Sequence, residues 1–219
     1  MLKRTPEPEL MDDLEQAVAY DEADFSTTDA DFVERFFRFC PEPRRVVDLG
    51  CGPGNLALRI AAGCTGAQVL AVDGSEAMLA RGRARRVAAL EARVRFAAHT
   101  LPDATLPQAS FDAVVSNSLL HHLHDPGVLW ATIAHVARPG AHVFVSDLRR
   151  PSSLEAVDTI VAAYAADAPD VLRRDFRASL HAAFTPDEIR AQLDERGWGN
   201  WRVEVTSDRH VVVCGRVPA

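Results

Sequence analysis

An apolar stretch that runs into a glycine loop and then into a helical stretch constrains the fold of this chain more than any other feature. Residues 46–55 read Val-Val-Asp-Leu-Gly-Cys-Gly-Pro-Gly-Asn. Glycines let a backbone approach a ligand closely, and the helix that follows offers free N–H groups and a positive dipole end. The next apolar stretch ends in Asp73, 23 residues after Gly50, where a carboxylate can accept both hydroxyls of an adenosine ribose. The sequence therefore predicts a nucleotide-type site at one edge of a parallel sheet.

The spacing of this loop leaves two kinds of ligand open. Its glycines follow a Gly-x-Gly-x-Gly pattern with Asp48 two residues ahead. The dinucleotide fingerprint instead requires a glycine at the position where this chain has Asn55. A loop that binds the pyrophosphate of a dinucleotide is thus the alternative interpretation.

Apolar runs alternate with amphipathic helical stretches, which is typical of an α/β fold with helices on both faces of a parallel sheet. The strand-like runs are residues 45–49, 68–72, 94–97, 111–116 and 141–146. Arg138-Pro139-Gly140 predicts the end of the helix that follows Asp125. Two further runs, 201–205 and 211–213, flank a short polar turn and predict a terminal antiparallel hairpin.

We expect one domain with two additions, because 219 residues can bury a sizeable core without disulfides. One addition is an N-terminal helical lid at residues 1–40. The other is a helical insertion at residues 148–184, which lies within a core that covers 41–219. Ser152 and Glu155 are spaced as a capping box for the first insertion helix. The apolar residues expected on one side of that helix are Leu154, Val157, Val161 and Tyr164. Residues 185–188 form a second capping box at the end of the insertion.

Charge and composition exclude several classes of partner. Residues 1–40 hold eleven acidic and four basic residues, and the rest of the chain is balanced. Proteins that bind nucleic acid through phosphates usually present a basic face, so no nucleic-acid partner is expected. We interpret the arginine run between Arg81 and Arg95 as a solvated helix face. No apolar run approaches a membrane span and no signal peptide is readable, so we expect no membrane partner and a cytoplasmic location. The four cysteines lack CxxC pairing, which favours reduced thiols.

Five motifs in order over residues 45–146 resemble those of class I S-adenosylmethionine-dependent methyltransferases, the small-molecule branch with ubiquinone and menaquinone methyltransferases in particular. They are Asp-Leu-Gly-Cys-Gly-Pro-Gly, Val-Leu-Ala-Val-Asp-Gly-Ser-Glu-Ala-Met, Ser-Phe-Asp-Ala-Val-Val-Ser-Asn, His-His-Leu-His-Asp-Pro and Arg-Pro-Gly. The resemblance implies a three-layer, doubly wound, seven-stranded sheet of order 3-2-1-4-5-7-6 with strand 7 antiparallel. It also implies S-adenosyl-L-methionine as cofactor, with S-adenosyl-L-homocysteine as product.

The resemblance also implies roles for individual residues. The glycines of the loop border the methionine part, Asp48 reaches the α-amino group, Asp73 holds the ribose, and Asn117 lies near the sulfonium. The cofactor-binding residues expected in this way are Tyr20, Asp48, Gly50, Cys51, Gly52, Pro53, Gly54, Asn55, Asp73, Gly74, Met78, His99, Thr100, Leu101, Asn117 and His122. The family often has an acidic residue after the third strand, where this chain has Thr100, with Asp103 as the alternative contact to adenine.

Methyl transfer from a sulfonium is an in-line displacement, so alignment and exclusion of water can supply most of the rate. The candidate catalytic residues are His121, His122 and Tyr20. The competing interpretation is that the histidines only pack their loop and cap its helix. No fourth ligand at a recognisable spacing accompanies His121, His122 and His124, so no metal is expected.

Asp147, Arg149 and Arg150 leave the last parallel strand at the ligand edge and are the candidate substrate-binding residues, with surface or helix-end pairing as the alternative for the arginines. The expected function is methyl transfer from S-adenosylmethionine to a small-molecule acceptor. The alternatives are a tRNA or protein methyltransferase of the same fold and a catalytically silent cofactor-binding protein. A monomer and a homodimer both remain open.

Overall fold

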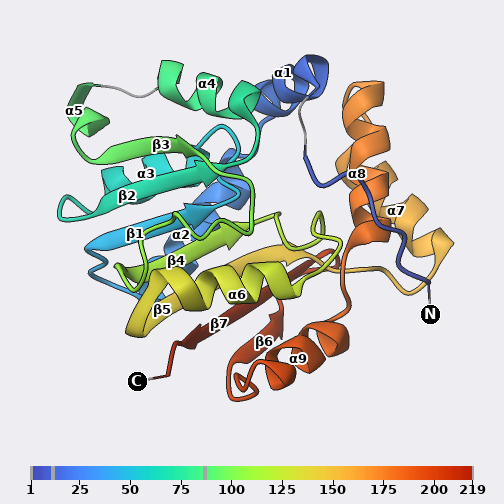
Figure 1. Cartoon of the computed structure of the whole chain (residues 1–219). Coiled ribbons are helices and arrows are strands. Elements are labelled where there is room, and N and C mark those ends of the chain that lie inside the picture. The colour runs from blue at the N-terminus through green and yellow to red at the C-terminus, as the bar shows by residue number, and fades with distance from the viewer. Residues whose placement is uncertain (1, 11–12, 86–87, 219) are drawn as a thin grey trace.

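The computed structural model describes residues 2–10, 13–85 and 88–218, and its centre is a seven-stranded sheet of order β3-β2-β1-β4-β5-β7-β6 (Figure 1). β7 runs antiparallel to both β5 and β6, while the other pairs are parallel. This confirms the expected order and the terminal hairpin. The strands are β1 (Arg45–Leu49), β2 (Gln68–Asp73), β3 (Val94–Ala98), β4 (Phe111–Asn117), β5 (Ala137–Leu148), β6 (Arg202–Val205) and β7 (His210–Arg216).

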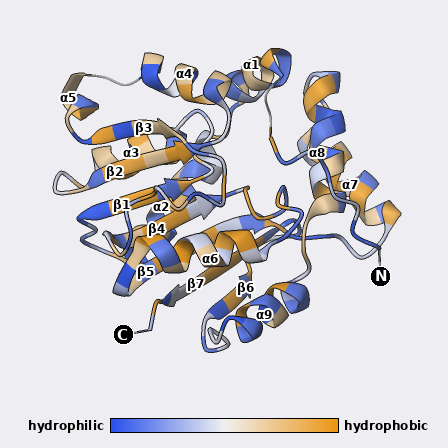
Figure 2. Ribbon diagram, viewed as in Figure 1, coloured by the Kyte–Doolittle hydropathy of each residue, from blue (hydrophilic) through white to orange (hydrophobic). Residues whose placement is uncertain are grey.

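Helices cover both faces of the sheet, and each face has its own apolar core. α6 (Gly127–Val136) and α9 (Pro186–Glu195) pack on one face, in front of the sheet in Figure 1. α2 (Ser26–Phe39) and α3 (Asn55–Gly63) pack on the other, together with α4 (Glu76–Arg85) and α5 (Ala88–Glu91). Hydrophobic residues concentrate in the strands between these layers (Figure 2), as expected for a sheet buried on both faces.

The fifth strand is longer than its sequence pattern predicts. α6 ends at Val136, and the backbone enters β5 at Ala137, so Arg138-Pro139-Gly140 belongs to the strand instead of ending the helix. The pairing with β4 is irregular between Phe111 and Ala113, where the extra residues are accommodated. Long β5 carries the chain to the edge of the sheet where the insertion begins.

The insertion consists of α7 (Leu154–Tyr164) and α8 (Asp170–Ala182), which share a small apolar core of their own. The N-cap of α7 is Ser153 and not Ser152, since the Ser153 side chain accepts the Ala156 N–H. Val157 and Val161 are buried as expected, whereas Leu154 and Tyr164 are exposed. At the end of the insertion, Thr185 and Glu188 form the predicted capping box of α9.

The N-terminal segment contains α1 (Leu14–Glu22) and α2, preceded by an extended stretch at residues 2–10 that we call the strap; residues 1, 11 and 12 of the expected lid lie outside the described residues. α1 is attached to α4 because Arg81 and Arg85 both pair with Asp21, at 2.5 and 3.1 Å. These two arginines are therefore not part of a solvated face, which corrects that interpretation.

The strap lies across the loop after β4 and against α8 (Figure 1). The Thr5 N–H donates to the His181 carbonyl at 3.0 Å. The Arg4 guanidinium donates to carbonyl oxygens of Ala182, His121 and Leu123 at 2.6 to 3.0 Å and stacks on the Phe184 ring. The strap thus joins the insertion to the loop that follows β4. Within the described residues, no helix is both long and apolar enough to cross a membrane.

Candidate active site

A cavity of about 1960 Å³ opens at the carboxyl edge of the sheet, beneath the strap, α1, α2 and α8. Its lining brings together nearly all of the residues that the sequence placed in the cofactor and catalytic sites. Those that line it are Tyr20, Asp48, Gly50, Cys51, Gly52, Pro53, Asn55, Asp73, Gly74, Met78, His99, Thr100, Leu101, Asn117, His121 and His122. Gly54, Asp147, Arg149 and Arg150 do not line it.

The three glycines of the loop differ in what they make room for. Gly50, Gly52 and Gly54 all have positive φ, a conformation that side chains rarely adopt. A Cβ on Gly54 would clash with the Phe96 ring, so this glycine serves packing beneath the loop. A Cβ on Gly52 would meet no atom within 4 Å. Gly52 therefore keeps the floor of the cavity open for a ligand.

Two carboxylates beside the loop differ in their hydrogen bonding. The Asp73 carboxylate accepts the Gly52 N–H at 2.7 Å and the Ser75 N–H at 2.8 Å, which fixes its orientation toward the cavity. Asp48 is buried, and its Oδ2 has no hydrogen-bond partner among the described residues. Burial, and then the nearby charges of Asp73 and Asp29, raise the pKa of Asp48 to about 7. A cationic group of a ligand would satisfy Asp48 and favour its ionised form.

Asp29, from the first turn of α2, is an acidic residue of the cavity that the sequence did not single out. It is 7% exposed and its carboxylate lies 3.6 Å from Arg59. Burial raises the pKa of Asp29, while Arg59 opposes the shift. Its only sequence signal is an acidic residue inside an otherwise amphipathic helix, which is more often a solvent-facing position.

The loop after β3 forms the side of the cavity where adenine is expected. Thr100 and Leu101 line it, whereas the Asp103 carboxylate bonds to His99 at 2.7 Å and to Thr105. The hydrogen bonds from Thr105 and His99 lower the pKa of Asp103 to about 2. Asp103 is thus engaged within its own loop, and the alternative contact to adenine is not supported.

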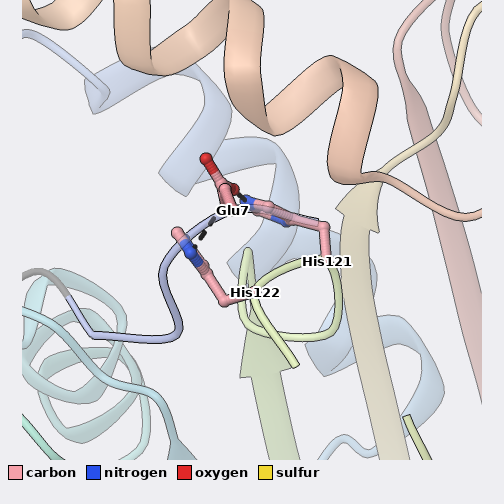
Figure 3. A group of neighbouring side chains, drawn as sticks. All are labelled: Glu7, His121 and His122. Carbon is pink, nitrogen blue, oxygen red and sulfur yellow. Dashed lines mark ion pairs between the residues drawn. The ribbon is translucent and has the colours of Figure 1, made fainter. Parts of the chain in front are cut away.

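His121 and His122 follow β4 and lie side by side, with ring centroids 4.3 Å apart. The Asp147 carboxylate lies 2.5 Å from Nδ1 of His121 and also accepts the backbone N–H groups of Leu120 and Leu148. Asp147 therefore supports His121 from behind and does not face the cavity. In Figure 3, Glu7 of the strap points between the two histidines, and its Oε1 lies 3.4 Å from Nε2 of His121 and from Nδ1 of His122.

The two neighbouring imidazoles have opposite pKa shifts. Burial disfavours the charged form of His121, but the carboxylates of Asp147 and Glu7 outweigh burial and raise its pKa. Burial, and then the charge of His121, lower the pKa of His122 to about 3. Glu7 has no motif around it in the sequence, and only the folded strap brings it to these histidines.

Tyr20 of α1 lines the cavity, and its ring lies 4.8 Å from that of Phe25, which also lines the cavity. Burial, and then the charges of Asp29 and Asp73, raise the pKa of Tyr20. Its phenol stays protonated at neutral pH, so Tyr20 can donate or accept a hydrogen bond but does not serve as an anionic base.

The structure corrects the placement of the two candidate substrate arginines. Arg150 is buried and donates to the Ala183 carbonyl and the Glu188 carboxylate, at 2.8 and 2.5 Å. Arg149 donates to the Ser207 carbonyl at 3.2 Å. Both tie the insertion to the end of the sheet, because the chain turns away from the cavity after Asp147. Arg209, which stacks on Tyr164, and Arg35 are arginines that do line the cavity.

Comparisons with known proteins agree with this geometry. Residues 46–140 match the methyltransferase domain family. The chain is 33% identical over 132 residues to a ubiquinone biosynthesis O-methyltransferase of Xanthomonas axonopodis pv. citri, covering 59% of this chain and 53% of that protein. It is 49% identical over 80 residues to a trans-aconitate 2-methyltransferase of Mycolicibacterium gilvum, covering 36% of this chain and 28% of that protein. The chain thus spans about half the length of the first of these relatives and less of the second.

Solved structures share the whole architecture at low sequence identity. A SAM-dependent methyltransferase from Aquifex aeolicus has a TM-score of 0.67 and 16% identity, covering 94% of this chain and 98% of its own. The plantazolicin methyltransferase BpumL in complex with SAH has a TM-score of 0.75 and 12% identity, covering 94% and 90%. These likenesses establish the fold of the chain.

Proposed function

We propose, from the premise that the chain carries a class I methyltransferase domain, that it transfers a methyl group from S-adenosylmethionine to a small-molecule acceptor. The observation that carries this proposal is the single cavity that runs from the glycine loop to the insertion. One ligand-sized pocket usually measures about 300–1,000 Å³, so about 1960 Å³ can hold a cofactor and an acceptor together.

The floor of the cavity, formed by the loops that follow β1, β2 and β4, suits S-adenosylmethionine. Asp73, oriented by the Gly52 and Ser75 N–H groups, would accept the ribose hydroxyls. Asp48, with its unpartnered Oδ2, would accept from the α-amino group of the methionine part. Together with Asp29, these acids favour a ligand that carries ammonium and sulfonium charges. Asp48 and Asp29 disfavour polyanions such as ATP and NAD, and NAD is the kind of ligand that the alternative loop interpretation requires.

The segments that cover the cavity, namely the strap, α1, α2 and α8, form its roof and suit methyl transfer. The acceptor atom attacks the methyl carbon in line, the carbon–sulfur bond breaks with its electron pair retained on sulfur, and S-adenosylhomocysteine results. The strap, α1, α2 and α8 line the cavity and would limit the access of water, and Asn117 and Tyr20 lie where polar contacts can align the reactants. Where the acceptor must lose a proton, Nε2 of His121, supported by Asp147, is the candidate to receive it.

The walls of the cavity favour a small, largely apolar acceptor with a polar or anionic end. Phe32, Phe144 and Phe176 supply apolar wall, and Arg209 supplies a positive charge. The chain itself covers the cavity and its N-terminal segment is acidic, which disfavours tRNA. The relatives named for ubiquinone biosynthesis and for trans-aconitate suggest phenols and carboxylates as the first acceptors to screen.

Thermal unfolding with ligands tests the proposal. S-adenosylmethionine at a hundred times its Kd should add about 2.7 kcal/mol and raise Tm by about 5–10 °C. Asp73→Ala should reduce this shift, and NAD and ATP should give none. Formation of S-adenosylhomocysteine is then measured with panels of phenols and carboxylates. A shift with NAD but none with S-adenosylmethionine would overturn the proposal, whereas cofactor binding without turnover on any small acceptor would favour a silent binding protein.

A further inference from the structure

We propose that Glu7, His121 and His122 form a Zn²⁺ site that fastens the strap to the loop after β4. The three side chains converge from segments more than 110 residues apart in the sequence (Figure 3). Two imidazoles and one carboxylate are a ligand set that proteins use for zinc with an open fourth position. The expectation of no metal considered His121, His122 and His124 without a fourth ligand, whereas the fold places Glu7 of the strap beside two of them.

The two distances from Glu7 to the histidines match a tetrahedral ion, and all three ligand atoms lie within 4.8 Å of one another. Bonds of 2.0–2.1 Å to zinc place neighbouring ligand atoms about 3.3–3.4 Å apart in a tetrahedron. Oε1 of Glu7 lies 3.4 Å from Nε2 of His121 and 3.4 Å from Nδ1 of His122. These separations are too long for good direct hydrogen bonds between the groups. They leave room for an ion between Glu7 and each imidazole.

The hydrogen bonds of His121 and Glu7 leave one ligand atom of each side chain available to an ion. Asp147 engages Nδ1 of His121 at 2.5 Å, which leaves the Nε2 lone pair directed toward Glu7. A carboxylate behind a ligating histidine is the usual support in zinc sites. Ser179 donates to Oε2 of Glu7 at 3.3 Å, while Oε1 is buried and has no hydrogen-bond partner among the described residues. The Pro8 carbonyl lies 3.3 Å from Nδ1 of His122 and can accept a hydrogen bond from it, so His122 would exchange this bond for the ion.

Charge also calls for a cation at this position. The Glu7 and Asp147 carboxylates are both buried around His121, with side chains 9% and 3% exposed. Arg4, the nearest strap cation, donates to carbonyl oxygens of His121 and Leu123 instead of to these carboxylates. A divalent ion would balance both carboxylates, whereas a proton on His121 would balance one. Metal and proton compete for the same Nε2 lone pair, so a bound ion would prevent His121 from acting as a base.

Metal titration of tag-free protein tests the site without using activity. The protein is stripped with chelator, dialysed and titrated with Zn²⁺, and the bound metal is measured by mass spectrometry; Co²⁺ in place of Zn²⁺ reports tetrahedral geometry by its visible absorption. We expect one ion per chain. Glu7→Gln and His122→Ala should weaken binding at least tenfold, and Asp147→Asn by about 10–100-fold.

Matched controls come from the same two segments. Glu9, whose carboxylate accepts the His124 N–H, and His124, whose Nε2 lies 2.9 Å from the Glu7 carbonyl, neighbour the group without belonging to it. Glu9→Gln and His124→Ala should therefore retain the ion, with circular dichroism confirming that every variant is folded. If Glu7→Gln does not fold, His122→Ala decides.

Absence of bound zinc in the unaltered chain, or binding by the Glu7→Gln and His122→Ala variants as tight as that of the unaltered chain, would overturn the site and indicate a protonated imidazole between two carboxylates. S-adenosylmethionine binding is measured on separate samples with Asp73→Ala, so failure of the metal site and failure of the proposed function are distinguishable.

Discussion

The floor and the roof of the cavity are built by different kinds of contact. The floor consists of loops that follow neighbouring strands β1, β2 and β4, and its key bond joins Asp73 to Gly52 across 21 residues. The roof is held by contacts such as Arg4 to Ala182, which span 178 residues. The floor can therefore be traced to short sequence motifs, whereas the roof depends on contacts that only the folded chain brings together.

Removal of the roof should have the largest effect on activity. Deletion of residues 2–25 takes away the strap and α1 but leaves α2, whose Phe32 and Phe36 belong to the core. We expect the truncated chain to fold and to lose at least about 100-fold in methyl transfer, because water enters and alignment is lost. Thermal unfolding and turnover on an identified acceptor measure this; full activity would show that the floor alone suffices. A truncation that starts at Asp31 would instead remove Asp29 and cut α2.

Two glycines of the floor should separate stability from binding. Gly54→Ala places a methyl group against the Phe96 ring at positive φ, which we expect to cost about 2–5 kcal/mol of unfolding free energy. Gly52→Ala meets open space and should cost only the backbone strain, about 1–2 kcal/mol, yet weaken cofactor binding. Denaturant unfolding and calorimetric titration measure the two effects. Equal stability losses would mean that Phe96 moves aside.

The two arginines after β5 should differ, although both lie outside the cavity. Arg150→Ala removes a buried guanidinium from Glu188 and the Ala183 carbonyl, and we expect a loss of about 1–3 kcal/mol, moderated because Glu188 is partly exposed. Arg149→Ala should cost less than about 1 kcal/mol. Neither should raise the KM of the acceptor in the folded enzyme. A raised KM with unchanged stability would return these residues to the substrate site.

A further prediction concerns the pH dependence of the floor. The pKa of Asp48 is raised from 3.8 to about 7 in the folded chain, so the folded state holds an extra proton between these values. This group therefore stabilises the fold at low pH, and its contribution declines as pH rises from about 4 to 7. Cofactor binding should behave oppositely, weakening up to about tenfold per pH unit below 7. Asp48→Asn should flatten both profiles in calorimetry between pH 5.5 and 8; an unchanged profile would assign the dependence elsewhere.

The sheet order was predicted from the family resemblance, and the strands and the floor from local sequence patterns. The spacing between the loop that starts at Gly50 and the apolar run that ends in Asp73 is enough to predict this part of the site. The N-cap of α7 is Ser153 and not the predicted Ser152, because the sequence does not show which of two adjacent serines begins the helix. Arg150 lies at the expected edge of the sheet, but the turn of the chain after Asp147 buries it against Glu188.

The partners of the histidines could not be predicted at all. Glu7 lies among prolines and acidic residues that resemble a solvated terminus, and nothing near it indicates a contact 114 residues away. The same holds for Asp29 in α2, whose neighbours predict an exposed position. Contacts of this kind depend on where the insertion and the strap meet, which is a property of the assembled fold.

The positions of the tryptophans determine which events change the intrinsic fluorescence of this protein. Trp130, Trp198 and Trp201 are buried on the face covered by α6 and α9, and none of them lines the cavity. The rings of Trp198 and Trp201 are stacked with centroids 4.3 Å apart. Intrinsic emission will therefore follow melting of that face and remain nearly constant when a ligand enters. A Phe25→Trp variant would place a chromophore beside Tyr20 and make occupancy of the cavity visible.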